Sequence, residues 1–233
     1  RDNWDFKLYL RLLVHYPFED EDKETTSLLF YQTNYDVISG KHNLTKEKIV
    51  SLAALQILNE YGSDLNQAKT AVNKNLQKYV PAKALKEHNI NELRQLILEE
   101  YSQISDFKRN EAKVNYSTIL EDLPTYQTQQ FDAKFNLTKS GTNDDNIPDD
   151  CVIGIKPEGI VILDRDRNQI VMYKYETILN WGISNNQFIL NLESSLTDVR
   201  KVCFFTSQTK IIQDLVEIYC NLLIGKTMKE IKE

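Results

Sequence analysis

Apolar and polar residues are arranged differently in the two halves of the chain. Over residues 23–121, apolar side chains recur every three or four positions, which is the spacing of helices that bury one face. After Pro124, short runs rich in β-branched and aromatic residues alternate with turn residues, a pattern typical of strands. The sequence therefore predicts an α+β protein with a helical part, 1–127, followed by a β-rich part, 128–233.

The first part predicts a small helical bundle. One apolar stripe ends at Gly40, and a second begins after Thr45 and ends at Gly62. Threonine is a common N-cap and glycine a common C-terminal stop, so we expect helix boundaries at these residues. Further helices are expected at 66–79, 91–104 and 108–123. An alternating run over 4–16 predicts a strand that precedes the bundle.

The second part predicts seven short strands and a final helix. The strands are expected at 129–137, 151–156, 160–163, 169–175, 178–184, 188–193 and 199–206. The helix is expected from Gln208, with a wide apolar face before Gly225. Seven regularly spaced strands capped by a helix predict a closed or nearly closed antiparallel barrel of the pleckstrin-homology or phosphotyrosine-binding (PH/PTB-like) kind.

Charge and cysteine content limit the classes of binding partner and the cellular compartment that are expected. The chain has 28 basic and 34 acidic residues, a net charge of −6, and its two parts carry −3 each. Binding to a nucleic-acid backbone requires a concentrated positive field, so we exclude a nucleic-acid-binding module. Three scattered cysteines predict reduced thiols in the cytoplasm. The apolar runs are too short for a membrane span.

No catalytic, metal-binding or cofactor-binding motif is visible. The three histidines do not stand beside a serine or cysteine in a known arrangement, and no glycine-rich phosphate loop is present. The acidic clusters 19–22 and 144–150 lack the ligand spacing of a calcium loop, so we interpret them as solvated loops. The stretch 164–168 is interpreted as a hairpin turn. We expect a protein that is not an enzyme and holds no cofactor or metal.

Trp181 is the strongest candidate for a binding residue. It lies in the expected strand 178–184, where the two-residue period places Trp181 and Ile183 on one face. This strand precedes an Asn-Asn turn and can have a free edge, to which an extended peptide can add as a further strand. Two interpretations stay open: Trp181 only fills the core, or it both packs and contacts a peptide.

The order of elements resembles the second and third lobes of a FERM domain. The sequence WDFKLYLR at 4–11 resembles the beginning of the second lobe in the tandem myosin-tail-homology/FERM modules of unconventional myosins, notably class VII. Further resemblances are LLFYQ at 28–32, LAALQ at 52–56, LQKYVP at 76–81 and LPTY at 123–126 followed by Phe131. They imply a helical lobe like acyl-CoA-binding protein and a PH/PTB-like lobe.

The resemblance implies a cargo- and regulator-binding module in the tail of an actin-based motor. Its partners would be cytoplasmic tails of adhesion receptors or adaptor proteins, at the cytoskeleton and the cell cortex or filopodia. The implied peptide groove, between the fifth strand of the third lobe and the C-terminal helix, has Asn180, Trp181, Gly182, Ile183, Ile212 and Tyr219 near the ligand. Arg200 and Lys201 lie where related tails contact their own motor head, or an acidic partner.

Two alternatives remain open. A talin- or ezrin-like adaptor would link adhesion receptors or membrane lipids to actin, although a net charge of −6 favours only weak contact with anionic lipids. A FERM module attached to a phosphatase or kinase would need catalytic motifs elsewhere in its parent chain. Because the ubiquitin-like first lobe is absent, we expect the sequence to be a fragment of a longer protein.

Overall fold

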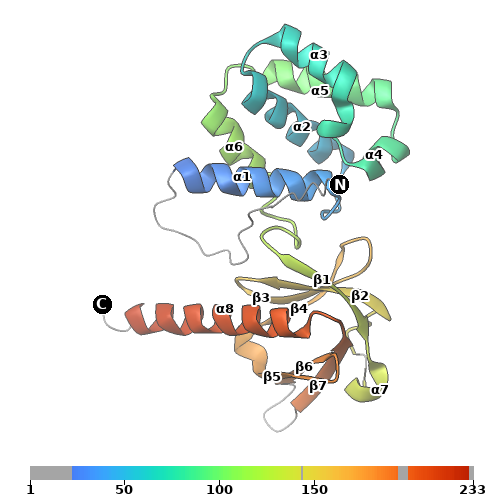
Figure 1. The fold of residues 1–233 in the computed structure, drawn as a ribbon, viewed down its shortest axis with the longest axis vertical. Coiled ribbons are helices and arrows are strands. Elements are labelled where there is room, and N and C mark those ends of the chain that lie inside the picture. Colours follow the sequence, from blue (N-terminus) through green and yellow to red (C-terminus); the bar gives the residue numbers. More distant parts are fainter. Residues whose placement is uncertain (1–22, 143, 194–198, 231–233) are drawn as a thin grey trace, which may run out of the picture.

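A computed structural model of the chain describes residues 23–142, 144–193 and 199–230. The strand expected at 4–16 lies outside these ranges. Figure 1 shows two lobes one after the other along the longest axis, a helical lobe and a lobe built on a β-sheet. Each lobe has its own large cluster of buried apolar side chains. The α+β fold expected from the sequence is confirmed.

The helical lobe is built around one buried helix, α2. Nearly every residue of α2 between Ile49 and Leu58 is buried, because α3, α5 and α6 pack around it. Thr45 caps α2 and Gly62, with φ 62°, ends it, as the sequence predicted. The elements of the lobe are α1 (Lys23–Ile38), α2 (Lys46–Tyr61), α3 (Leu65–Asn75), the 3₁₀ helix η1 (Leu76–Lys78), α4 (Ala82–Glu87), α5 (Ile90–Gln103) and α6 (Arg109–Thr118).

Several boundaries in the helical lobe differ from the expectation. The helix expected over 108–123 ends at Thr118. The helix expected over 66–79 ends as α-helix at Asn75 and continues as the tighter η1. The short helix α4 was not expected. Proline lacks the N–H that a helix interior requires, so Pro81 starts a new helix and stands at the N-cap of α4.

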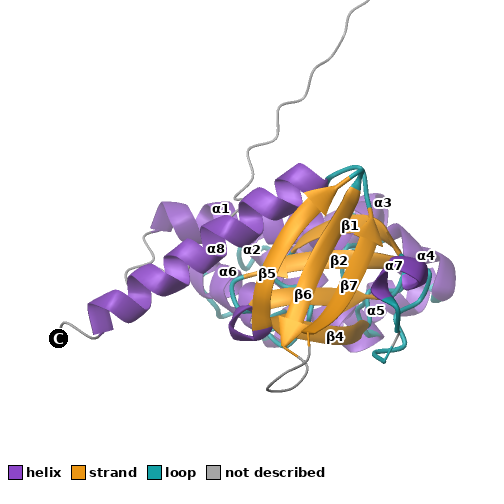
Figure 2. Ribbon diagram, turned by 90° about the horizontal axis from the view of Figure 1, so that it is seen from below, coloured by secondary structure: helices purple, strands orange, loops and turns teal. Residues whose placement is uncertain are grey.

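The second lobe is one antiparallel sheet of seven strands in the order β4-β3-β2-β1-β7-β6-β5. All seven were expected from the sequence. Figure 2 shows the long helix α8 lying against the sheet. The strands are β1 (Gln129–Phe135), β2 (Asp150–Lys156), β3 (Gly159–Leu163), β4 (Gln169–Lys174), β5 (Ile178–Ser184), β6 (Gln187–Glu193) and β7 (Val199–Phe205). The helices are α7 (Leu137–Ser140), η2 (Tyr175–Thr177) and α8 (Thr209–Glu230).

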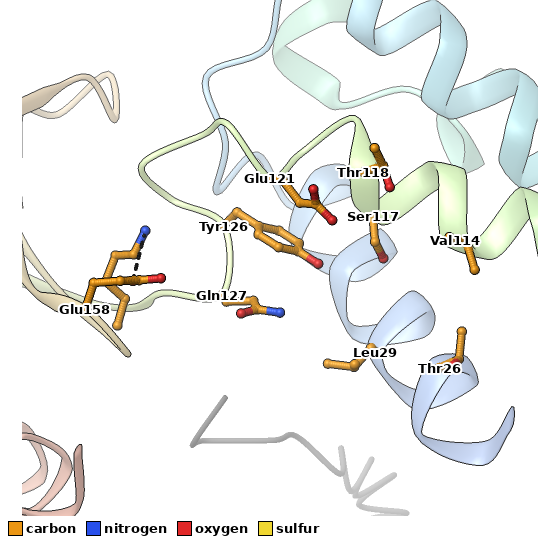
Figure 3. A pocket seen from close by; sticks show the side chains of 10 residues that line it. Thr26, Leu29, Val114, Ser117, Thr118, Glu121, Tyr126, Gln127 and Glu158 are labelled. Atoms are coloured by element: carbon orange, nitrogen blue, oxygen red, sulfur yellow. Dashed lines mark ion pairs between the residues drawn. The ribbon is translucent and has the colours of Figure 1, made fainter. Parts of the chain in front are cut away.

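Polar contacts join the two lobes. Asn43 in the loop after α1 donates a hydrogen bond of 2.8 Å to Asn168, in the hairpin turn between β3 and β4. Lys83 of α4 pairs with Asp166 of the same turn at 3.3 Å. His42 Nδ1 lies 2.7 Å from Thr125 Oγ1 in the connector between the lobes. A cavity lies beside this junction (Figure 3).

His42 is expected to make the junction sensitive to acid. Burial lowers the pKa of His42 from 6.5 to about 4, against the smaller opposing effect of Asp36. Between these two pH values the unfolded chain binds a proton that the folded chain does not, so stability falls as the pH falls below 6.5. We expect a loss of about 2 kcal/mol between pH 7 and pH 5 from this residue.

Urea unfolding of the wild type and the His42→Gln variant at the two pH values measures this contribution. Glutamine keeps a hydrogen-bonding side chain but does not titrate in this range, so the variant should lose about 2 kcal/mol less than the wild type on acidification. An equal loss in both proteins would show that His42 is not the source.

Candidate functional site

Strand β5 forms one edge of the sheet. Among the strands that the structure describes, its one neighbour is β6. The two strands are joined by the two-residue turn Asn185-Asn186, whose φ angles of 48° and 60° suit asparagine. Within the described ranges β5 therefore has the edge position expected from the sequence, and such an edge is where a further strand can add.

Trp181 and Ile183 point to the inner face of the sheet, the face that α8 covers. Their partners in the β5–β6 ladder are Leu190 and Phe188, which are fully buried. Because directly paired residues share a face, Trp181 and Ile183 face inward with them. Trp181 is half-buried against the core of the lobe, whereas Ile183 at the edge is 43% exposed. Trp181 thus packs on the core and also reaches the surface.

A β-bulge in β5 explains why Ile178 and Trp181 both contact the core although they are three positions apart, a spacing that would place them on opposite faces of a regular strand. The register shifts between Ile178 and Asn180, so that Leu179 is the extra residue of the strand. Ile178 is buried, and Leu179 is 50% exposed. Strict alternation in the sequence does not reveal this bulge.

Asn180 and Gly182 face the opposite side of the sheet. Asn180 accepts a hydrogen bond of 2.6 Å from the side chain of Asn191 on β6. A Cβ atom added at Gly182 would meet nothing within 4 Å. The structure therefore separates these two residues from Trp181 and Ile183. They belong to the same strand but not to the same surface.

Ile212 and Tyr219 of α8 lie beneath this surface and do not line it. Their exposed fractions are 0% and 1%, and both belong to the core on which Trp181 packs. The sequence placed them near a ligand, and in the structure both side chains are buried in the core of the sheet lobe. The exposed apolar residues of α8 include Ile211 and Ile218, which are 47% and 41% exposed and lie on one side of the helix.

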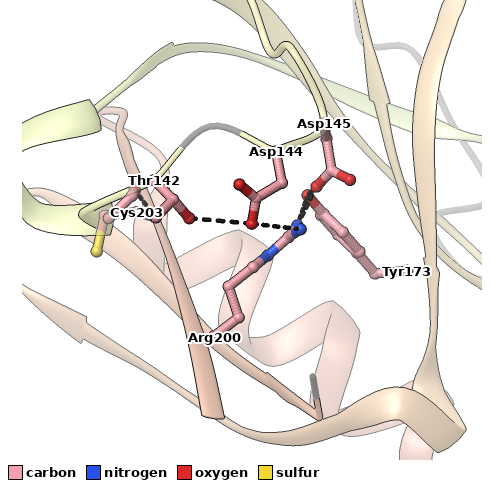
Figure 4. A network of polar contacts seen from close by, with 7 residues as sticks. Thr142, Asp144, Asp145, Tyr173, Arg200 and Cys203 are labelled. Atoms are coloured by element: carbon pink, nitrogen blue, oxygen red, sulfur yellow. Dashed lines mark hydrogen bonds and ion pairs between the residues drawn. The ribbon is translucent and has the colours of Figure 1, made fainter. Parts of the chain in front are cut away.

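Arg200 is already engaged within the chain (Figure 4). Its guanidinium forms an ion pair with Asp145, lies 3.7 Å from Asp144 and donates a hydrogen bond of 3.1 Å to the hydroxyl of Tyr173. Only 20% of the Arg200 side chain is exposed. A partner would have to compete with these contacts, whereas the neighbouring Lys201 is exposed.

The same network corrects the interpretation of the acidic cluster 144–150 as a solvated loop. Burial and the hydrogen bond that its hydroxyl donates to Asp145 raise the pKa of Tyr173. Asp150 pairs with Arg165 at 2.6 Å. These partners lie far from the acidic residues in the sequence, so local pattern does not predict the pairs. The acidic residues attach the loop before β2 to β4 and β7.

Burial shifts the pKa values of the three cysteine thiols, and the described residues form no cluster of three or more metal ligands. Burial raises the pKa of Cys151 to about 12 and also raises the pKa of Cys203 and Cys220. Within the described ranges, His, Cys, Asp and Glu side chains do not gather in groups of three or more that could hold a metal ion. Every helix in these ranges is too short or too polar to span a lipid bilayer.

Comparison with known proteins identifies both lobes. Residues 19–131 match the model of the FERM central domain, and residues 135–224 match the model of the PTB domain of IRS-1 type. Unconventional myosin heavy chain 6 of Caenorhabditis elegans is 24% identical over 226 residues, which are 95% of this chain and 10% of that protein. Human Talin-2 is 20% identical over 209 residues, 89% of this chain and 8% of that protein.

A solved structure has the same fold. The C-terminal MyTH4-FERM domain of human Myosin 7b, in complex with the PDZ3 domain of harmonin-a, superposes with a TM-score of 0.71 at 22% identity. The match covers 93% of this chain and 42% of that one. The chain thus spans a small part of the myosin and the talin, and less than half of the solved myosin domain.

Proposed function

Because this chain joins a FERM central domain to a PTB-like domain, we propose that it is a non-catalytic binding module from the tail of an unconventional myosin. It binds the cytoplasmic tails of adhesion receptors or adaptor proteins as extended peptides. The binding site is the β5 surface, which we define as the outer edge of β5 together with the side chains of Trp181 and Ile183. The module acts at the actin cytoskeleton, in the cell cortex or filopodia.

The observation that carries the proposal is the unpaired edge of β5 beside a half-buried tryptophan. A peptide that adds to a sheet edge gains main-chain hydrogen bonds, which are the same for most sequences. Specificity then comes from side chains next to the edge. Trp181 offers a large apolar surface that is held in place by the core, and such anchors dominate binding energy at interfaces.

The register of β5 indicates which backbone groups meet the peptide. The two-residue turn is closed by the pair Ser184–Gln187, which in such hairpins is hydrogen-bonded. Hydrogen-bonded and non-hydrogen-bonded pairs alternate along an antiparallel ladder. Trp181 and Ile183 therefore stand at non-hydrogen-bonded positions, and their N–H and C=O groups point outward.

The relatives support a protein as the partner. The Myosin 7b structure contains a PDZ domain of harmonin, so a related module binds a protein. A talin-like adaptor function with anionic lipids is less well supported here, because the net charge is −6 and the guanidinium of Arg200 is paired with carboxylates. Because Arg200 is engaged within the chain and Lys201 is exposed, contact with a motor head would depend on Lys201.

Amide hydrogen exchange tests the proposed geometry. A peptide array of adhesion-receptor cytoplasmic tails supplies the tightest ligand, which is then added to the chain. We expect exchange at the amides of Trp181 and Ile183 to slow by about tenfold or more, because both become hydrogen-bonded. The amide of Gly182, already directed to β6, should change little. Protection confined to β4 or to the helical lobe would contradict the proposal.

A further inference from the structure

A second surface, far from the β5 edge in the sequence, lies between the lobes. A cavity of about 340 Å³ is enclosed by α1, α6, the connector after α6 and the turn between β2 and β3. Figure 3 shows Thr26 of α1, Ser117 of α6, Glu121 and Tyr126 of the connector and Glu158 of the turn around this space. The proposed peptide site on β5 uses none of these residues.

The cavity continues along the outer face of α6. A neighbouring cavity of about 470 Å³ is lined by residues of α6 and by Phe107 just before it. Val114 lines both cavities. Val114 is 54% exposed and Phe107 is 41% exposed, so both side chains present apolar area to the solvent. The α6 surface, as we call the two cavities together, is therefore apolar at the Phe107 end.

The end of the α6 surface between the lobes is rich in hydrogen-bond acceptors and carries negative charge. Glu121 and Glu158 both line it, with one lysine, Lys156. Lys156 is paired with Glu158 at 3.4 Å and its side chain is 17% exposed. Glu121, in contrast, has no ion pair among the described residues. Hydroxyl groups of Ser117 and Thr118 add further acceptors.

These groups match a cationic side chain. A guanidinium or ammonium group has only donors, and it requires carboxylate and hydroxyl oxygens around it. An anionic lipid headgroup would be repelled by the two glutamates. Val114 lies on α6, which ends at Thr118, and Glu121 lies in the connector that follows it. The apolar and the acidic end of the surface are therefore adjacent along the chain.

We propose that the α6 surface docks a segment of a partner protein that carries an arginine or lysine close to a large apolar side chain. The apolar side chain lies on Val114 and Phe107, and the cation lies at Glu121 between the lobes. Charge complementarity selects the partner at one end, and burial of exposed apolar area stabilises the complex at the other. This inference does not depend on the β5 surface.

Selection from a random peptide library tests the proposed docking of a cationic segment on the α6 surface. A phage library of twelve-residue peptides is selected on the wild-type chain and counter-selected on a variant with Val114→Ser and Glu121→Lys. Both residues are exposed, so the variant should keep its circular dichroism spectrum. We expect the surviving peptides to share an arginine or lysine together with a leucine, isoleucine or phenylalanine. They should bind Glu121→Lys about tenfold or more weakly than wild type.

The Glu87→Lys variant is the matched control. It makes the same change of net charge at an exposed residue of α4, and the selected peptides should bind it within about twofold of the wild type. The proposal is overturned if no peptide distinguishes wild type from the double variant, or if the distinguishing peptides lack a cation. Equal weakening by Glu87→Lys would also overturn it, because binding would then follow total charge.

Discussion

Replacing Trp181 by alanine is expected to weaken peptide binding at the β5 surface by about 30-fold or more while the helical lobe stays folded. The side chain packs on the core of the sheet lobe and reaches the free edge, so its removal takes away a rigid apolar anchor. Truncation of such anchors typically costs more than about 2 kcal/mol of binding energy.

The measurement is an affinity pull-down from cytosol with the wild-type and variant chains, followed by titration of the recovered partner. Two matched variants control for general damage. Phe205→Ala removes an aromatic side chain that is 43% exposed from β7. Gly182→Ala alters β5 itself on the opposite face, where an added methyl group meets open space. Both variants should bind within about twofold of the wild type.

Circular dichroism and unfolding curves decide between the two interpretations of Trp181. If Trp181→Ala unfolds the sheet lobe, the side chain is required for the core and its role in binding stays undemonstrated. If the folded variant retains the same partners as the wild type, the β5 surface is not the principal site. In that case the α6 surface becomes the first place to examine.

The sequence predicted the fold well because its signals are local. Seven short runs after Pro124 have a two-residue period, and the segment over 23–121 has a period of three to four residues. Each period depends only on which face of the element is buried. Helix α2 was bounded correctly since Thr45 and Gly62 act through neighbouring backbone groups. Helix α4 was missed because its six residues are too few to show a period.

The sequence predicted the candidate site only in part. The edge position of β5 followed from its place before the Asn185-Asn186 turn, together with the barrel order. The burial of Ile212 and Tyr219 depends on the angle at which α8 crosses the sheet, which a helical period does not specify. The pairing of Arg200 with Asp145 joins residues 55 positions apart, so only the folded structure shows it.

Gly159→Ala is expected to destabilise the sheet lobe by about 3 kcal/mol, the upper range for inserting an atom into a packed region. A Cβ atom at Gly159 would lie 2.3 Å from the carbonyl oxygen of Tyr173 and 3.0 Å from the Cα atom of Lys174. Both are backbone atoms of β4, paired with β3 in the ladder, and they cannot rotate away. Relief requires β3 and β4 to separate, which breaks hydrogen bonds at the other edge of the sheet.

Urea unfolding followed by the fluorescence of Trp181 reports this loss, in a Trp4→Phe background that leaves one tryptophan in the chain. Gly182→Ala is the control, because the same methyl group is added to the same sheet where it has no neighbour within 4 Å. It should match the wild type or be stabilised by about 0.5 kcal/mol, since alanine loses less entropy on folding. Equal stabilities for the two alanine variants would contradict the close approach of β3 and β4. A selective loss in Gly159→Ala would show that the edge that presents Trp181 depends on backbone packing at the opposite edge of the same sheet.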